Sequence, residues 1–240
     1  MEARDRLVFA LDVSGGVEAL RFVELLRGVV GTFKIGLELF CAEGPSLVRA
    51  VAERGGAVFL DLKLHDIPAT VGRAAERAVA GGGVRWLTVH SAGGSGMMRE
   101  AVRACGDRAG VLGVTVLTSV DDDVAARVGI DRPVADLAVR LAAEAVEAGC
   151  AGVVASPGEA AAIRRRVGAG PVVVTPGIRP AGGARPDRDD QRRVATPEAA
   201  IAAGADVLVV GRPIRDAPDP VGAALAILRS IAGVTAREAP

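Results

Sequence analysis

Two lysines, Lys34 and Lys63, are the side chains best suited to proton transfer, because arginine supplies all the other positive charges among the 29 basic residues. A guanidinium stays protonated near neutral pH and cannot act as a proton donor, whereas a lysine ammonium can. Lys63 lies in the apolar segment 59–68, between Asp61 and Asp66. Burying unpaired charges there would be costly, so this spacing predicts an array of paired lysines and aspartates.

The elements that must position these residues follow a repeating pattern. Short runs of β-branched residues alternate with amphipathic stretches, which is typical of βα units and a parallel sheet. Eight strands are expected, at residues 7–13, 32–35, 58–63, 86–90, 111–117, 152–156, 172–175 and 207–210. The clearest expected helices lie at 17–30, 68–80, 134–148 and 220–231. Eight units predict an α/β fold, a single-domain (β/α)8 TIM barrel over residues 1–240, with its active site at the carboxyl ends of the strands.

This barrel would bring the charged residues together. Alternate side chains of a strand share a face, so Asp61 and Lys63 both point into the barrel. The same alternation puts Asp12 on the inner face, and Lys34 on the second strand can approach its neighbours' carboxylates. The cluster could be a structural salt-bridge network that closes the barrel mouth, since such networks also bury ions. The scarcity of lysine favours the catalytic interpretation.

Glycine and arginine follow the last two expected strands, where barrels commonly hold a phosphate group. Gly211 and Arg212 come directly after the eighth strand, and Pro176 and Arg179 follow the seventh. Backbone N–H groups near glycine can approach an anion closely, and arginine can bind its oxygens. The loop 178–191 is long for a βα connection and rich in Gly, Pro, Arg and Asp, which predicts a mobile lid over this phosphate site.

Other polar residues at strand ends have simpler interpretations. Thr118 follows the fifth strand, where its hydroxyl could contact a heterocycle or simply begin a turn. His65 and His90 are expected to be hydrogen-bonded packing residues, because neither has a second histidine at metal-ligand spacing. The three aspartates at 121–123 are expected to start a helix, whose N-terminus favours acidic side chains. Ser156 and Thr175 also lie at the ends of expected strands.

The composition excludes several classes of function. A formal net charge of zero and 2% aromatic residues argue against nucleic-acid binding, which needs basic grooves and stacking side chains. The three cysteines, Cys41, Cys105 and Cys150, form no CxxC pair, so neither a disulfide framework nor a zinc site is expected. Free cysteines suit a cytoplasmic protein. Asp12 interrupts the first apolar run, so no signal peptide or membrane span is expected.

The segment 61–68, which reads DLKLHDIP, resembles the DxKxxDI signature of the orotidine 5′-phosphate decarboxylase family. The resemblance extends from about residue 7 to residue 220, with the family's other segments in the same order. These segments are ALD at 10–12, FKIG at 33–36, VHSAGG at 89–94, VTVLTS at 114–119, TPGIRP at 175–180, DQRR at 190–193 and VGRP at 210–213.

The resemblance implies roles for the charged array. Asp12 and Lys34 would contact the ribose, and Asp61 and Lys63 would flank the carboxylate that is lost. Lys63 would then donate a proton to the product carbon. Lys34, Asp61 and Lys63, together with Asp66, resemble the family's catalytic set, and Asp12 resembles a substrate-binding residue.

The resemblance also implies partners and substrate contacts. Asp66 and Thr70 would reach from one chain into the active site of the other chain of a homodimer. Thr118 resembles the residue that contacts the pyrimidine. The implied phosphate-binding residues are Arg179, Gln191, Gly211 and Arg212.

The implied reaction is decarboxylation of orotidine 5′-monophosphate to uridine 5′-monophosphate, the last step of de novo pyrimidine synthesis, without metal or cofactor. Two alternatives stay open. Related barrels, 3-keto-gulonate 6-phosphate decarboxylase and hexulose-phosphate synthase, share the DxKxxD element but use Mg²⁺, and they place an acidic ligand near the position of Lys34. A cation at that position disfavours metal. The chain could also be a non-catalytic phosphometabolite-binding barrel, which the intact Lys63 and Asp66 disfavour.

Overall fold

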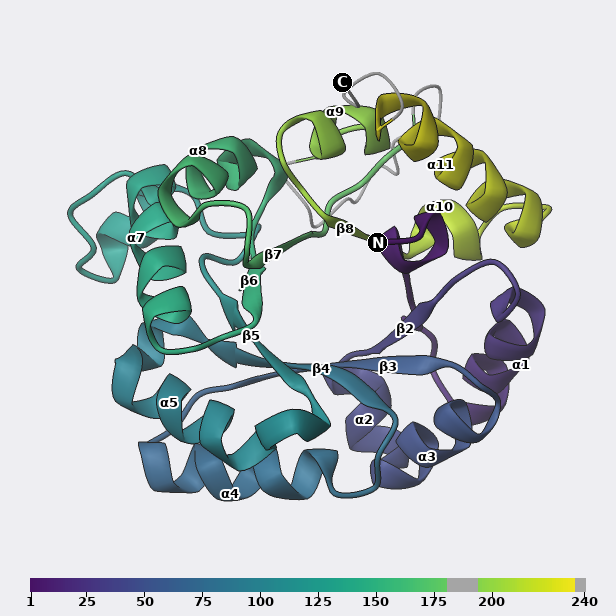
Figure 1. The fold of residues 1–240 in the computed structure, drawn as a ribbon, viewed down its shortest axis with the longest axis horizontal. Coiled ribbons are helices and arrows are strands. Elements are labelled where there is room, and N and C mark those ends of the chain that lie inside the picture. Colours follow the sequence, from purple (N-terminus) through teal and green to yellow (C-terminus); the bar gives the residue numbers. More distant parts are fainter. Residues whose placement is uncertain (181–193, 236–240) are drawn as a thin grey trace.

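The computed structural model describes residues 1–180 and 194–235. Eight parallel strands close into a barrel, because each strand pairs with the next and β8 pairs with β1 (Figure 1). The strands are β1 (Leu7–Ala10), β2 (Thr32–Ile35), β3 (Ala57–Leu64), β4 (Val84–His90), β5 (Gly110–Val114), β6 (Gly152–Val154), β7 (Val172–Thr175) and β8 (Val207–Val210). The predicted (β/α)8 TIM barrel is therefore confirmed.

Helices surround this barrel in Figure 1. They are α1 (Gly16–Leu26), α2 (Leu37–Glu43), α3 (Pro45–Glu53), α4 (Pro68–Val79), α5 (Gly94–Cys105), α6 (Asp122–Arg127), α7 (Val134–Glu147), α8 (Pro157–Val167), α9 (Pro197–Ala202), α10 (Arg212–Arg215) and α11 (Pro220–Thr235). Three short 3-10 helices, η1 (Ala3–Arg6), η2 (Ser91–Gly93) and η3 (Gly106–Arg108), complete the described elements. Within those described residues, none of the helices is long and apolar enough to cross a membrane.

Side chains inside the barrel are separated from those outside it by strand alternation. The outward residues pack under the helices in one large core, which includes Leu7, Phe9 and Leu60. A second, smaller cluster fills the interior of the barrel, and its buried members are Val8, Ala10, Phe59, Trp86, Leu112, Val174, Val207 and Val209. The interior is thus a packed apolar plug, and polar side chains of the same face follow it at the carboxyl ends of the strands.

Several predicted strands are longer than the observed ones. The strands β1, β5 and β6 end at Ala10, Val114 and Val154, three, three and two residues before the predicted ends. One further inter-strand bond follows β1, from the N–H of Leu11 to the carbonyl of Lys34 at 2.9 Å. The chain then leaves the sheet at Asp12, although Val13 beyond it is again apolar and buried. Hydrophobicity overestimates strand length here because apolar residues beyond the strands are buried under loops or line the cavity described below.

The helix boundaries show the same effect. The predicted helix at 17–30 ends earlier, at Leu26, because Val29 and Val30 pack against the core from a turn. In contrast, α11 continues to Thr235, beyond the predicted end at 231. The prediction for the three aspartates is confirmed: Asp121 caps α6 by accepting a hydrogen bond from the N–H of Val124 at 3.0 Å.

Candidate active site

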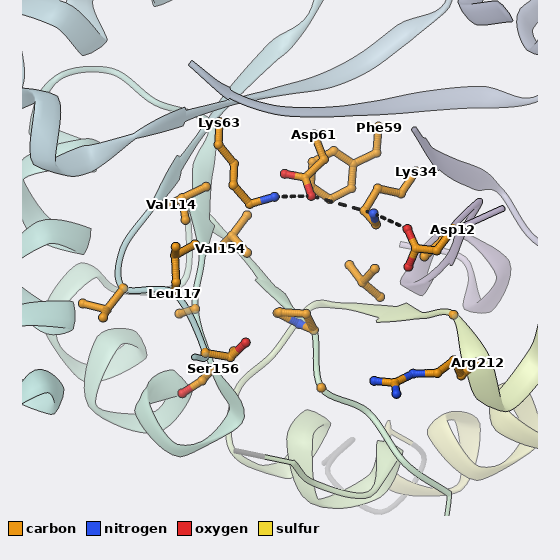
Figure 2. Close-up of a pocket in the computed structure, with 18 of the residues that line it drawn as sticks. Asp12, Lys34, Phe59, Asp61, Lys63, Val114, Leu117, Val154, Ser156 and Arg212 are labelled. Carbon is orange, nitrogen blue, oxygen red and sulfur yellow. Dashed lines mark hydrogen bonds and ion pairs between the residues drawn. The ribbon is translucent and has the colours of Figure 1, made fainter. Parts of the chain in front are cut away.

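A cavity of about 260 Å³ opens at the carboxyl ends of the strands (Figure 2). Its wall contains nine of the residues singled out in the sequence: Asp12, Lys34, Asp61, Lys63, Thr118, Pro176, Arg179, Gly211 and Arg212. Ser156 also lines it. The barrel therefore gathers residues that are up to 200 positions apart in the chain into one chamber.

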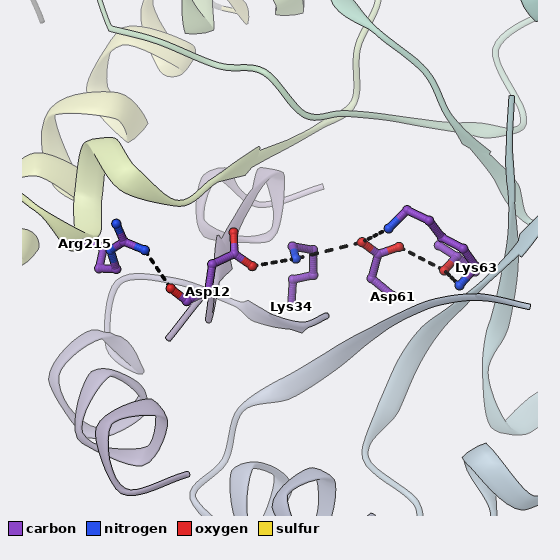
Figure 3. A network of polar contacts seen from close by, with 6 residues as sticks. Asp12, Lys34, Asp61, Lys63 and Arg215 are labelled. Carbon is purple, nitrogen blue, oxygen red and sulfur yellow. Dashed lines mark hydrogen bonds and ion pairs between the residues drawn. The ribbon is translucent and has the colours of Figure 1, made fainter. Parts of the chain in front are cut away.

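An alternating array of charges crosses one side of this chamber (Figure 3). Lys34 Nζ lies 3.0 Å from Asp12 Oδ1 and 3.9 Å from Asp61 Oδ2. Lys63 Nζ donates to the same Asp61 Oδ2 at 2.7 Å. The order is Asp12, Lys34, Asp61, Lys63, so each of the two inner charges lies between two opposite charges.

Asp61 is the most deeply buried member of the array, with only 8% of its surface exposed. Burial by itself raises the pKa of a carboxyl group. The charges of Lys34 and Lys63, together with hydrogen bonds from Lys63 and Thr88, outweigh that effect and lower the pKa of Asp61 below its ordinary value of 3.8. Asp61 is therefore an ionised carboxylate at neutral pH, surrounded by groups that stabilise its charge.

The backbone at Lys63 departs from a regular strand. Its φ is 49°, which makes Lys63 the one non-glycine residue with positive φ in the described part of the chain. The register between β3 and β4 shifts between Leu60 and Leu64. This left-handed conformation costs an L-residue roughly 1–2 kcal/mol. Regular alternation was therefore the wrong local geometry for Lys63, although its ammonium does face the cavity beside Asp61.

The irregular turn is held by a neighbouring strand. The hydroxyl of Thr88 on β4 accepts a hydrogen bond from the backbone N–H of Lys63 at 2.9 Å and donates one to Asp61 Oδ1 at 3.0 Å. Sequence reasoning missed Thr88. A signal was present, because strand alternation from Trp86 places a polar side chain at an interior position where the barrel is otherwise apolar.

The opposite side of the chamber is formed by the loops after β7 and β8. Arg212 lies across the cavity from Lys63 (Figure 2). Gly211 packs closely on the first strand, since a Cβ there would lie 3.3 Å from Asp12 Oδ2 and 3.4 Å from the Ala10 side chain. Arg179 is anchored by its backbone N–H, which donates to the Ala195 carbonyl at 2.9 Å. This side combines glycine backbone with two guanidinium groups, a combination suited to an anion.

An apolar wall joins the two charged sides. It consists of Phe59, Val114, Leu117, Val154 and Val209. Sequence reasoning did not assign these residues to the site, because an inward apolar residue near a strand end has the same pattern as one in the barrel plug. A flat ring can pack on such a wall while its polar groups meet the charged residues.

Two predicted site residues, Asp66 and Thr70, do not line this chamber. Asp66 is exposed and accepts a hydrogen bond from the N–H of Ile67 at 2.6 Å, and neither Asp66 nor Thr70 lines the cavity of its own chain. Gln191 and residues 181–191 of the expected lid lie outside the described residues.

The two histidines and Thr175 also lie outside the cavity wall. The rings of His65 and His90 contact each other, with centroids 5.5 Å apart. Burial, then the nearby His65 and Lys63, lower the pKa of His90, against an opposing effect of Asp61. The hydroxyl of Thr175 is buried and has no hydrogen-bond partner among the described residues. In that same part of the chain, no group of three or more His, Cys, Asp or Glu residues could hold a metal ion.

The chain matches, over residues 5–227, the model of the orotidine 5′-phosphate decarboxylase / HUMPS family. It belongs to that family. The resemblance inferred from the DxKxxDI segment is thus confirmed. Among relatives, the chain is 54% identical to orotidine 5′-phosphate decarboxylase of Anaeromyxobacter sp. (strain K), a match covering 95% of this chain and 98% of the relative. It is 50% identical to the enzyme of the same name from Syntrophotalea carbinolica, which covers 97% of each chain.

Solved structures of similar proteins have the same barrel. Orotidine 5′-phosphate decarboxylase from Lactobacillus acidophilus superimposes with a TM-score of 0.82 at 33% identity, over 95% of this chain and 99% of that one. An uncharacterized conserved protein from Geobacillus kaustophilus gives a TM-score of 0.82 at 35% identity, over 94% of this chain and 99% of that one.

Proposed function

We propose that this protein decarboxylates orotidine 5′-monophosphate to uridine 5′-monophosphate and CO₂, the last step of de novo pyrimidine synthesis. The observation that carries the proposal is the Asp12–Lys34–Asp61–Lys63 array, which faces Arg212 across one cavity in a member of the decarboxylase family. The two sides match a substrate with a carboxylate on its ring and a phosphate at its other end.

In the proposed reaction, the bond from C6 of the pyrimidine to the carboxylate breaks and CO₂ leaves. The electron pair stays on C6, so the site must stabilise negative charge on carbon. The Lys63 ammonium, fixed by Asp61 at 2.7 Å, supplies a positive charge that is oriented before the reaction begins. Lys63 Nζ then transfers a proton to C6 and becomes a neutral amine, which regains its proton from water.

Substrate binding is assigned to the rest of the chamber. Asp12 and Lys34 would hold the ribose, and Thr118 would contact the pyrimidine. The phosphate would be bound by Arg179, Gln191, Gly211 and Arg212, and Pro176 would be a further substrate contact. Phosphate contacts lie far from C6, so their binding energy can lower the barrier only by ordering the site around the reacting ring.

The Mg²⁺-dependent relatives are the nearest alternative. Lys34 occupies the position where they are expected to carry an acidic ligand, and it is already paired with Asp12 and Asp61. A bound Mg²⁺ would have to approach this cation closely, which is electrostatically unfavourable. A non-catalytic binding barrel is disfavoured because it would have no use for the strained, paired Lys63.

One assay tests these possibilities together. The ultraviolet absorbance of orotidine 5′-monophosphate should fall on addition of the protein, and prolonged dialysis against EDTA should leave the rate unchanged. Loss of the rate in EDTA with recovery in Mg²⁺ would support the metal-dependent alternative. Binding of the nucleotide without turnover would support the non-catalytic one.

We also propose a homodimer with shared sites, in which Asp66 and Thr70 of each chain complete the site of the other. Asp66 follows Lys63 by three residues, is exposed, and does not line its own cavity. The adjacent Ile67 is 67% exposed, and Leu37, after β2, is 52% exposed. Large apolar side chains exposed beside a site are typical of a surface covered by a partner.

The cytoplasm is the proposed location. Cys41, Cys105 and Cys150 are all free, as is usual for proteins of a reducing compartment. Burial raises the pKa of Cys105 to about 11 and that of Cys150 to about 12, so both thiols stay protonated and unreactive. Cell fractionation, with the activity measured in each fraction, tests this assignment.

A further inference from the structure

Thr88 occupies an unusual place in the barrel. It lies on β4 and is completely buried, two residues beyond Trp86 of the interior cluster. It does not line the cavity, so it cannot touch a substrate there. Its hydroxyl is the group through which β4 reaches the two members of the charged array on β3, Asp61 and Lys63.

This single hydroxyl makes two hydrogen bonds of opposite direction. Its oxygen accepts the backbone N–H of Lys63 at 2.9 Å, and its proton goes to Asp61 Oδ1 at 3.0 Å. The other carboxylate oxygen, Asp61 Oδ2, accepts from Lys63 Nζ at 2.7 Å. Thr88, Asp61 and Lys63 therefore form a closed ring, in which the backbone and the side chain of Lys63 are both held.

The ring occurs where the chain is strained. Lys63 has a φ of 49°, and the β3–β4 register shifts between Leu60 and Leu64, so the sheet does not hold this peptide by regular pairing. A strained conformation persists only where its surroundings determine it. The Thr88 hydroxyl supplies that constraint, because it replaces the missing inter-strand partner of the Lys63 N–H.

We propose that Thr88 is a positioning residue for the decarboxylation, whose hydroxyl fixes the Asp61 carboxylate and the Lys63 backbone in the geometry that aims the ammonium at C6. The inference rests on the proposed function. Neither a valine nor an alanine at this position can make the two bonds, so the ammonium would keep its charge but lose its fixed direction. Such a loss affects the reaction step more than nucleotide binding, because the phosphate contacts lie on the other side of the cavity.

The test compares kcat for orotidine 5′-monophosphate and the affinity for uridine 5′-monophosphate in a set of variants. Thr88→Val keeps the shape and removes the hydroxyl, and it should lower kcat roughly 10- to 100-fold. Its affinity for uridine 5′-monophosphate should stay within about threefold of wild type. Thr88→Ser keeps the hydroxyl and should retain most of kcat.

Thr115→Val is the matched control. Thr115 is also buried and directly follows the end of β5, but its hydroxyl donates to a backbone group, the carbonyl of Val154, at 3.1 Å. Removing this hydroxyl should lower the free energy of unfolding and leave kcat within about twofold of wild type. Equal losses of kcat in Thr88→Val and Thr115→Val would overturn the proposal.

A second pair of variants keeps the test valid if Thr88→Val does not fold. Thr88→Ser and Thr88→Ala both remove the methyl group and differ only in the hydroxyl, so the ratio of their kcat values isolates it. A ratio of about 10 or more supports the proposal, and a ratio near one contradicts it. Failure of all the Thr88 variants to fold would also contradict it, since the hydroxyl would then serve the barrel. Wild type that leaves orotidine 5′-monophosphate intact would contradict the proposed function instead.

Discussion

Asp61 is the residue on which the charges of the site depend. Its two oxygens bind three groups: Lys63 at 2.7 Å, Lys34 at 3.9 Å and the Thr88 hydroxyl at 3.0 Å. Removing a partner from such a buried array leaves a charge without compensation, which costs more than the array itself contributes. The two lysines also differ in position: Lys34 lies between two carboxylates, whereas Lys63 is at the end of the array and faces open space in the cavity.

The first prediction concerns the proton donor. Lys63→Arg keeps the positive charge, but a guanidinium releases no proton at working pH, so kcat should fall by roughly 100-fold or more. Lys34→Arg is the matched comparison, because a ribose contact needs a cation and transfers no proton; its KM should rise while kcat falls less. Steady-state kinetics on folded proteins separate the two. Near-normal kcat in Lys63→Arg would remove Lys63 from the donor role.

The second prediction concerns acid stability. The folded pKa of Asp61 lies below the ordinary 3.8, so its ionisation adds stability that is complete above the unfolded pKa and is lost as the pH falls through the folded pKa. Asp61→Asn resembles the protonated group. The difference in unfolding free energy between wild type and Asp61→Asn should be constant above about pH 5 and should shrink towards lower pH. Urea unfolding at several pH values measures it, and a difference independent of pH would contradict the assignment.

At the scale of elements, the site depends on a tie, a side-chain hydrogen bond that joins the segments following β1 and β8. Arg215, at the end of α10, donates from Nη1 to the backbone carbonyl of Asp12 at 2.6 Å (Figure 3). Its guanidinium is also held by Asp216. The segment after β1 has left the sheet at Asp12, so this bond replaces the pairing that a strand would provide. The loop after β8 thereby positions the carboxylate that pairs with Lys34.

The third prediction tests this tie. Arg215→Met keeps the packing of the stem but loses the bonds, and it should lower the unfolding free energy by about 1 kcal/mol. The KM for orotidine 5′-monophosphate should rise a few-fold, which corresponds to about the same free energy as the loss of stability, while kcat changes little. Arg229→Met on α11 is the control, because Arg229 is exposed and distant in sequence from the cavity wall. Equal effects in both variants would show that the tie does not position Asp12.

At the scale of the whole molecule, one chain contains a chamber that lacks two of the predicted site residues. Lys63 faces the inside of its own barrel, whereas Asp66, three residues later, lies on the surface. The left-handed turn at Lys63 and the end of β3 at Leu64 separate the two directions. In the two-fold dimer proposed above, Asp66 of each chain would complete the chamber of the other.

The fourth prediction follows from that arrangement. Lys63→Ala and Asp66→Asn should each be inactive as homodimers. After subunits are exchanged between equal amounts of the two, about half the dimers are mixed, and each mixed dimer has one intact site and one doubly defective site. About a quarter of all sites should therefore regain activity. A tagged subunit verifies the exchange, and no recovery after it would mean that Asp66 acts within its own chain.

The sequence by itself determined the barrel, the inward Asp61, and the placing of Gly211 and Arg212 after the last strand. These follow from patterns of two to four residues, which the chain carries locally. Tertiary structure decided which side chains meet. Thr88 and Lys63 are 25 residues apart, and Arg215 and Asp12 are 203 apart. Such pairs depend on the register between strands, which shifts at Lys63, and on the residue at which each strand leaves the sheet. The alternation of apolar and polar residues predicts neither.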